Sequence, residues 1–213
     1  MSTRLYPVYL DLQDRDVLVV GGGRVAARKV AVLLNSGADI TVLAPSVSNE
    51  LEELSAKNQI SLHTRPYRTE DMSDKWLVIA ATDDPDVNHQ VSLDAAEAGV
   101  FCNVVDDPEL CSFQVPAVVR RGLLQIAIST GGASPGLAKR LRRQLETEFG
   151  PAYEKLLDGL MELRQHVQSK YPERPKTRRR ILEDFLDSPA PARLIQDENA
   201  QGFRRILDEW KDE

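Results

Sequence analysis

Short apolar runs alternate with amphipathic stretches over the first hundred residues. The apolar runs are VLVV (17–20), ADITVLA (38–44), ISLHT (60–64), WLVIAAT (76–82) and VFCNVV (100–105). Such continuous hydrophobicity is typical of parallel strands that are covered on both faces of a sheet. The alternation with helical stretches therefore predicts a doubly wound α/β domain.

The stretches between these runs carry apolar residues at helical spacing. The first stretch places one apolar face along a helix, made of Val25, Ala26, Val30, Leu33 and Leu34. A second helix is predicted from Asp86 to Ala98. Gly37 and Gly99 stand where these helices should end, because a residue without a Cβ adopts a left-handed cap most easily.

The pattern changes after Asp106. PAVVRRGLLQIAISTGG reads as two extended segments around an Arg-Gly turn, which predicts a hairpin. Ser134 and Pro135 then suit the cap and first position of a helix. Its apolar stripe consists of Leu137, Leu141, Leu145 and Phe149.

The remaining residues are predicted to be helical. One helix is expected from Pro151 to Tyr171, and two short helices ending at Trp210 are expected between the proline-rich breaks YPERPKT and SPAPA. We therefore predict three parts: a nucleotide-binding domain over residues 1–112, a small segment over 113–150, and a helical domain over 151–213.

Composition and charge narrow the class of protein. The 213 residues are 42% hydrophobic and 28% charged, which is typical of soluble globular proteins. No run approaches the roughly 18 apolar residues of a membrane span, and the first residues lack the apolar segment of a signal peptide. The net charge of −6 argues against general nucleic-acid binding. We expect a cytoplasmic protein that binds neither membranes nor nucleic acids.

Cysteine and histidine spacing predicts no metal centre. Cys102 and Cys111 share one stretch, where two reduced thiols, a disulfide or a metal knuckle are the alternatives, and a cytoplasmic location favours the thiols. The three histidines show no ligand spacing. Basic residues gather at 120–121, 139–143 and 176–180, where they either form solvated helix faces or hold a polycarboxylate.

The most informative stretch is VVGGGRVAARK, in which Gly21, Gly23 and Ala26 follow a strand and open a helix. Gly21 permits a tight turn, Gly23 lets the backbone approach a pyrophosphate, and Ala26 lets the helix pack close to the sheet. The phosphates would lie at the positive end of the helix. Dinucleotide binding is therefore the prediction, and a purely structural turn is the alternative.

The neighbouring loops should complete a nucleotide site. The second strand ends at Pro45 and Ser46, without the acidic residue that usually binds the adenosine ribose. Serine can bond a ribose hydroxyl but does not repel a 2′-phosphate, so we expect NAD while NADP stays open. Thr82 and Asp83 follow the fourth strand, at the edge where ligands of such sheets bind.

A second candidate site follows the fifth strand, in FCNVVDDPELCSFQVPA. Asn103, Asp106 and Asp107 should lie at the same edge as the glycine turn. An acid there can accept a proton while a substrate carbon loses hydride to a nicotinamide. Capping of a turn by aspartate is the alternative that this local pattern leaves open.

Read together, the motifs carry a family resemblance. GGGRVAARK, ATDDPDVN, FCNVVDDPELCSF, PAVVRRG and ISTGGASPGLAKRLR occur in this order over residues 5–150. This arrangement closely resembles precorrin-2 dehydrogenase, the amino-terminal module of siroheme synthases. The resemblance implies a Rossmann-type domain, NAD as cofactor, and oxidation of precorrin-2 to sirohydrochlorin. The chain is shorter than the fused enzymes, and we expect it to lack their methyltransferase module.

The resemblance also assigns roles to individual residues. The family's functional acid maps onto Asp106, and its cofactor contacts map onto Arg24, Val25, Pro45 and Ser46. We expect the polycarboxylate substrate to contact Asn103 and the loop of Thr130, Gly131 and Gly132. Members of the family are homodimers whose chains meet through the segment after the nucleotide-binding domain, so residues 113–150 are the expected dimerisation segment. Some members also insert Fe²⁺ into sirohydrochlorin, so iron is a further expected substrate. A non-catalytic module that senses NAD is the alternative from another functional class.

Overall fold

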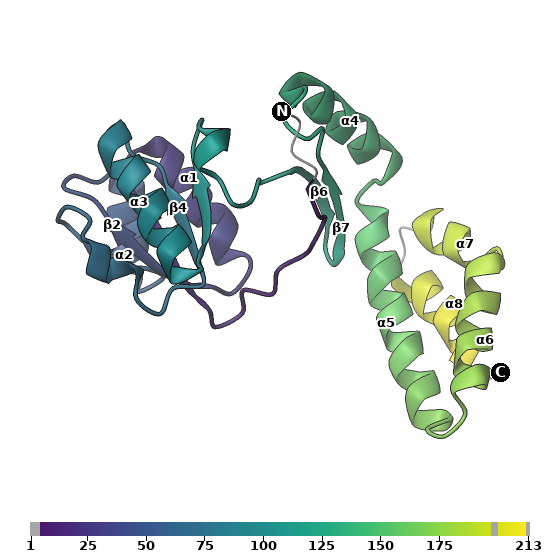
Figure 1. Cartoon of the computed structure of the whole chain (residues 1–213). Helices are drawn as coiled ribbons and strands as arrows, with labels where there is room; N and C mark the ends of the chain where they lie inside the picture. The colour runs from purple at the N-terminus through teal and green to yellow at the C-terminus, as the bar shows by residue number, and fades with distance from the viewer. Residues whose placement is uncertain (1–4, 197–199, 212–213) are drawn as a thin grey trace. The chain divides into compact units, whose positions relative to one another are not determined.

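The computed structural model describes residues 5–196 and 200–211, and the chain divides into two units between Val115 and Pro116. We call them the amino-terminal unit and the carboxyl-terminal unit. Figure 1 labels the helices and strands of both. The predicted three-part division at residues 112 and 150 stays a prediction.

The amino-terminal unit is built on a five-stranded parallel sheet with the order β3-β2-β1-β4-β5. The strands are β1 (Asp16–Val20), β2 (Asp39–Leu43), β3 (Ser61–His63), β4 (Leu77–Ala80) and β5 (Phe101–Val104). All five lie within the predicted apolar runs or begin one residue outside them. The predicted doubly wound α/β fold is therefore confirmed.

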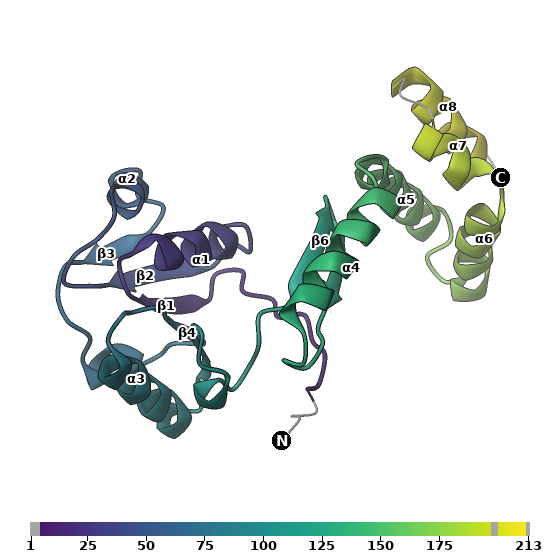
Figure 2. The same cartoon turned by 90° about the horizontal axis from the view of Figure 1, so that it is seen from above.

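Helices cover both faces of this sheet. Figure 2 shows α1 (Arg24–Leu34) and α2 (Asn49–Ala56) on one side and α3 (Pro85–Ala98) on the other. Val19 of β1 packs in one core cluster with Val30 of α1, whereas Leu18 packs in a second cluster with Val91 of α3. Because successive strand residues point to opposite faces, the central strand is buried on both sides.

Two short 3₁₀ turns lie in the connections of the sheet. They are η1 (Thr69–Met72), which precedes β4, and η2 (Pro108–Leu110), which follows β5. The buried side chain of Met72 anchors the first turn in the α3-side core cluster. The first turn therefore belongs to the loop that leads into β4, and the second belongs to the loop that leaves the edge strand β5.

The carboxyl-terminal unit begins with the predicted hairpin, β6 (Ala117–Arg121) and β7 (Leu124–Ile128), which pair antiparallel. Gly122 supplies the left-handed residue of its turn, with φ +53°. Helix α4 (Pro135–Glu148) follows, and Ser134 caps it as predicted, since its Oγ accepts the Leu137 N–H at 3.2 Å.

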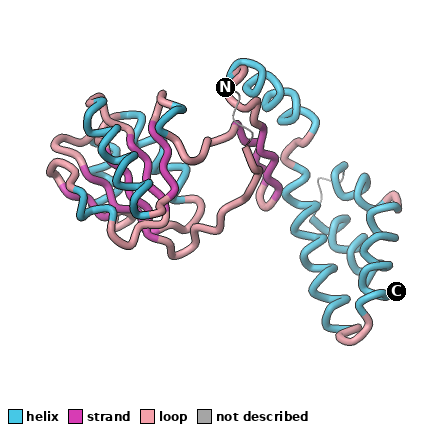
Figure 3. The backbone as a smooth tube through the Cα atoms, in the orientation of Figure 1, coloured by secondary structure: helices cyan, strands magenta, loops and turns pink. Residues whose placement is uncertain are grey.

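Helices form the rest of this unit, drawn in cyan in Figure 3. They are α5 (Ala152–Lys170), α6 (Pro175–Asp187), α7 (Ala190–Gln196) and α8 (Ala200–Lys211). Leu163, Phe185 and Leu194 form the centre of their shared core.

The prediction of two short helices after Tyr171 is wrong, because the described residues there form three. The predicted break at SPAPA is present, since α6 ends at Asp187 and α7 begins at Ala190, with Pro191 in its first turn, where proline costs no hydrogen bond. The separation of α7 from α8 falls at residues 197–199, outside the described residues.

Candidate functional site

The loops that follow β1, β2, β4 and β5 gather at the carboxyl edge of the parallel sheet. They carry the predicted site residues of the amino-terminal unit: Gly21, Gly23, Arg24 and Val25 after β1, Pro45 and Ser46 after β2, Thr82 and Asp83 after β4, and Asp106 after β5. The sheet thus brings the predicted nucleotide contacts and the predicted acid to one edge, where such sheets bind ligands.

Two glycines of the turn are required by close packing of the backbone. Gly21 has φ +128°, and a Cβ there would lie 2.2 Å from the carbonyl oxygen of Ala81. A Cβ on Gly22 would lie 2.0 Å from the carbonyl oxygen of Ser46. The Gly21 N–H also donates to the Leu43 carbonyl at 2.8 Å. Side chains are therefore excluded here because the loops after three strands meet.

Gly23 differs from its neighbours because the space beside it is open. A Cβ on Gly23 would meet nothing within 4 Å, and its φ of −81° suits any residue. The residue caps α1 without a side-chain hydrogen bond, and the first turn of α1 holds no acidic residue. An uncapped helix end beside open space is what a pyrophosphate needs. The residues present therefore fit a dinucleotide.

The loop after β2 contains an unsatisfied polar group beside this turn. Pro45 and Ser46 are exposed, and Ser48 donates its N–H to the Gly22 carbonyl at 2.8 Å. The Ser48 Oγ is buried and has no hydrogen-bond partner. Buried hydroxyls are normally satisfied, so this unpaired hydroxyl stands out beside the glycine turn. The sequence analysis missed Ser48, although it stands two residues after the predicted ribose contact.

The loop after β4 is held by Asn88 of α3. Asn88 donates from Nδ2 to the Thr82 carbonyl at 3.0 Å and accepts the Thr82 hydroxyl at 2.8 Å. Asp84 caps α3 by accepting the Asp86 N–H at 3.0 Å. The Asp83 side chain is exposed. Thr82 is therefore fixed by the protein, and Asn88 is a positioning residue that the sequence analysis did not single out.

The two adjacent aspartates after β5 differ in their bonding. Asp107 accepts the Glu109 N–H at 3.2 Å and so caps η2. Asp106 is exposed and held at φ +62°, and none of the hydrogen bonds found among the described residues involves its carboxylate. Left-handed backbone in a residue other than glycine marks constrained positions. The turn thus presents the Asp106 carboxylate, and capping, the alternative interpretation, applies to Asp107.

Asn103 is buried and fastens the segment that follows this turn. Its Nδ2 donates to the Phe113 carbonyl at 3.1 Å. Ser112 and Cys111 add to this fastening, since Ser112 Oγ accepts the Cys102 N–H at 2.7 Å and Cys111 Sγ accepts the Val104 N–H at 3.2 Å. Asn103 therefore shapes the loop of Asp106, and its role as a substrate contact stays a prediction.

Both cysteines in this segment are free thiols. Burial raises the pKa of Cys102 to about 11. Burial also raises the pKa of Cys111. A raised pKa keeps the protonated thiol dominant near neutral pH. The two residues therefore serve packing and hydrogen bonding in this loop, as the reduced-thiol interpretation predicted.

The sequence matches two family descriptions along its length. Residues 8–117 match the family described as putative NAD(P)-binding, and residues 121–148 match the central part of sirohaem biosynthesis proteins. The solved structure of SirC, a precorrin-2 dehydrogenase, superimposes with a TM-score of 0.81 at 31% identity, covering 98% of this chain and 100% of that one. The chain belongs to the precorrin-2 dehydrogenase family.

Siroheme synthases are also similar to this family member. The chain is 43% identical to the siroheme synthase of Nitrosospira multiformis over 86% of its own length and 39% of that protein. It is 41% identical to the siroheme synthase of Methylococcus capsulatus, over 97% of this chain and 43% of that protein. The chain thus spans about two fifths of the length of these curated relatives.

The remaining candidate residues of this family member lie in the carboxyl-terminal unit, in the loop between β7 and α4. Gly131 and Gly132 have φ of +59° and +84°. The Gly131 N–H donates to Ser129 Oγ at 3.1 Å, and Thr130 Oγ1 accepts the Ser134 N–H at 3.1 Å. The loop therefore uses part of its polar groups for its own hydrogen bonds, and the expected contact of Thr130, Gly131 and Gly132 with the substrate stays a prediction.

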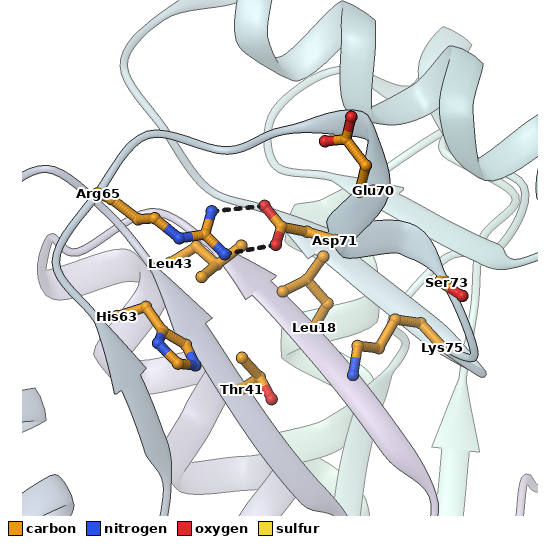
Figure 4. Close-up of a pocket in the computed structure, with 9 residues that line it drawn as sticks. All are labelled: Leu18, Thr41, Leu43, His63, Arg65, Glu70, Asp71, Ser73 and Lys75. Carbon is orange, nitrogen blue, oxygen red and sulfur yellow. Dashed lines mark hydrogen bonds and ion pairs between the residues drawn. The ribbon is translucent and has the colours of Figure 1, made fainter.

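A polar hollow on the sheet face lies apart from the residues predicted for this family (Figure 4). Its volume is about 250 Å³, and its lining includes His63, Arg65, Asp71 and Lys75. Arg65 forms a two-fold ion pair with Asp71, at 2.6 and 2.7 Å, and Lys75 pairs with Asp16 at 3.4 Å. Because Arg65, Asp71 and Lys75 are paired within the protein, we interpret the hollow as part of the folded structure and not as a ligand site.

Two further observations bear on the predictions for this family member. Among the described residues, no group of three or more His, Cys, Asp or Glu side chains is arranged to hold a metal ion. Likewise, no helix in the described part of the chain has the length and hydrophobicity needed to span a membrane.

Proposed function

We propose that the chain oxidises precorrin-2 to sirohydrochlorin with NAD as the hydride acceptor. One observation carries the proposal: the unbonded Asp106 carboxylate stands at the same sheet edge as the open turn at Gly23. The similarity to a precorrin-2 dehydrogenase over nearly the whole chain supports this substrate.

The proposed mechanism divides the work between the loops of this edge. The backbone at Gly23 and the N-terminus of α1 bind the pyrophosphate, and the loop of Thr82 borders the bound dinucleotide. Bound NAD supplies the hydride acceptor. Asp106 accepts the proton that the substrate loses, since a carboxylate without hydrogen-bond partners is free to act as a base.

Turnover tests the proposed function directly. Protein is mixed anaerobically with precorrin-2 and NAD, and NADH and sirohydrochlorin are followed by their absorbance. We expect both products to form together in equal amounts. A protein that binds NAD in a separate titration but forms neither product would refute the enzyme and favour the NAD-sensing module.

Iron insertion into sirohydrochlorin is a second candidate activity. The similar full-length proteins are named siroheme synthases, and siroheme contains iron. Asp106 would then accept pyrrole N–H protons as Fe²⁺ enters the ring. The test supplies sirohydrochlorin and Fe²⁺ without NAD and follows the siroheme spectrum. A rate equal to that of the protein-free control would restrict the chain to oxidation.

We further propose a homodimer that forms through the hairpin and α4. Leu137 and Leu141 on α4 are 48% and 36% exposed, and Leu123 in the hairpin turn is 59% exposed. Burial of such a stripe by a second copy would remove apolar surface from water. Sedimentation should give a dimer for the wild type and a monomer for Leu137→Glu/Leu141→Glu. Lys139→Glu on the same helix is the control, and a monomeric wild type would refute the dimer.

The proposed cellular location is the cytoplasm. The free thiols Cys102 and Cys111 support it, because exported proteins commonly oxidise such pairs. Fractionation of cells with antibody detection is the test. Recovery of the protein in an exported fraction would contradict the proposal.

A further inference from the structure

Lys29 of α1 is a charged group at the candidate site that the mechanism above does not use. Lys29 is half-buried and lies one turn from the buried residues Ala26 and Leu33 on its helix. The core cluster of these residues also includes Val105, the residue before Asp106, and Phe113. The buried residues beside Lys29 and the residue before Asp106 therefore contribute to the same core cluster.

The direction of the helix places the ammonium toward the reactive edge. Helix α1 starts at the carboxyl edge of the sheet, immediately after Gly23. Side chains on a helix lean toward its N-terminus, so the long chain of Lys29 extends back toward that edge. Asp106 stands at the same edge, after β5.

The electrostatic surroundings of Lys29 agree with this placement. Burial lowers the pKa of Lys29, and the neighbouring Arg28 lowers it further, whereas Asp106 and Cys111 act in the opposite direction. Among the groups that act on the pKa of Lys29, Asp106 supplies the carboxylate. The ion pairs found in the described parts of the chain do not include Lys29, so it is not held by a direct salt bridge.

We propose that Lys29 is a positioning residue for Asp106, whose carboxylate its ammonium orients. The proposal rests on the proposed oxidation of precorrin-2. Attraction between the Lys29 ammonium and the Asp106 carboxylate favours one orientation of this carboxylate. The turn itself gives the carboxylate no hydrogen bond that would fix it. Because Lys29 is anchored on a helix, the charge stays fixed while substrate enters and leaves.

Steady-state kinetics on the full chain test this role. Lys29→Met should lower kcat by about tenfold, the order of loss when the partner of a functional group is removed. The KM values for precorrin-2 and NAD should stay unchanged, because the lysine is assigned to Asp106 and not to either substrate. Lys29→Arg should restore most of kcat, and the exposed Lys57→Met is the control without effect.

The variants also separate the competing roles. In an Asp106→Asn background, Lys29→Met should cost nothing more, since both changes remove the same interaction. A raised KM for precorrin-2 at unchanged kcat would overturn the proposal in favour of a substrate-binding lysine. A Lys29→Arg variant as impaired as Lys29→Met would overturn it in favour of a packing role.

A measurement without turnover keeps this proposal distinct from the proposed function. The carboxyl carbon resonance of Asp106 is recorded by NMR in the wild type, Lys29→Met and Lys57→Met. We expect a shift in Lys29→Met and none in Lys57→Met. An unchanged Asp106 resonance in Lys29→Met would overturn the pairing, whether or not the wild type oxidises precorrin-2.

Discussion

The two units of the chain bury their apolar residues in different ways. In the amino-terminal unit, α1 and α3 cover opposite faces of the sheet, and Val19 and Leu18 of the central strand are fully buried between them. In the carboxyl-terminal unit, α4 leaves Leu137 and Leu141 largely exposed. The first unit completes its own core, whereas α4 presents a stripe that a further surface would cover.

The amino-terminal unit therefore carries the proposed chemistry, and the carboxyl-terminal unit carries the proposed dimer contact. The proposed base and the nucleotide turn both lie at the edge of a sheet whose core is complete, so substitutions there should change activity without unfolding. Substitutions in the helical core around Leu163 should do the reverse. The predictions below test this separation, beginning with the largest effect.

Removal of the Asp106 carboxylate should give the largest effect. Asp106→Asn should lower precorrin-2 oxidation by roughly 10²–10⁴-fold, the usual cost of losing a positioned base. Asparagine tolerates the φ of +62°, so folding and NAD affinity should be preserved. Asp107→Asn is the matched control, because asparagine also caps a helix end. Turnover by Asp106→Asn at the wild-type rate would contradict the mechanism.

The second largest effect is expected from a negative charge in the glycine turn, which should strongly weaken NAD binding. Gly23→Asp should fold, because nothing lies within 4 Å of its Cβ position, yet it should weaken NAD binding by roughly 100-fold through repulsion of the pyrophosphate. Gly150→Asp is the control, since its Cβ position is equally open. Calorimetric titration with NAD measures both, and equal affinities would identify the turn as purely structural.

A cavity in the helical core should destabilise the carboxyl-terminal unit. Leu163 is fully buried there, and Leu163→Ala should lower the free energy of unfolding by about 2–5 kcal/mol. NAD affinity should not change, because the nucleotide turn belongs to the other unit. Chemical denaturation and NAD titration of the same variant provide the two values. Loss of NAD binding along with stability would show that the units are not separable.

The smallest predicted effect concerns the ion pair in the polar hollow. The Arg65 guanidinium holds the pKa of Asp71 below its ordinary value of 3.8. The pair therefore stabilises the fold fully above that pH, and the stabilisation is lost as the pH falls through the lower folded value. The Tm difference between the wild type and Arg65→Gln should shrink from about pH 6 to about pH 2. A difference that is independent of pH would exclude this linkage.

The sequence predicted the features that local pattern determines. Continuous apolar runs located all five strands, and the spacing of Gly21 and Gly23 located the open turn, because each depends on neighbouring residues alone. The helix count after Tyr171 was wrong because the second predicted helix is divided into α7 and α8, and no proline or glycine stands between Gln196 and Ala200 to mark the division.

The sequence could not reveal contacts between distant segments. The adjacent Asp106 and Asp107 are chemically identical in the sequence, and the capping of η2 by Asp107 distinguishes them. Asn103 of β5 was assigned to the substrate, but its amide donates to the Phe113 carbonyl ten residues away. Lys29 was visible in VAARK, but the sequence does not show that Asp106 and Cys111 act on its charge, because these residues come from distant segments.

The central claim is that one sheet edge holds both the dinucleotide and the base. A crystal structure of the protein with NAD bound tests it most directly. We predict that the pyrophosphate lies against the backbone of Gly23 at the start of α1 and that the nicotinamide ring lies beside the Asp106 carboxylate. A nicotinamide directed away from Asp106, or a pyrophosphate bound outside the glycine turn, would contradict the account.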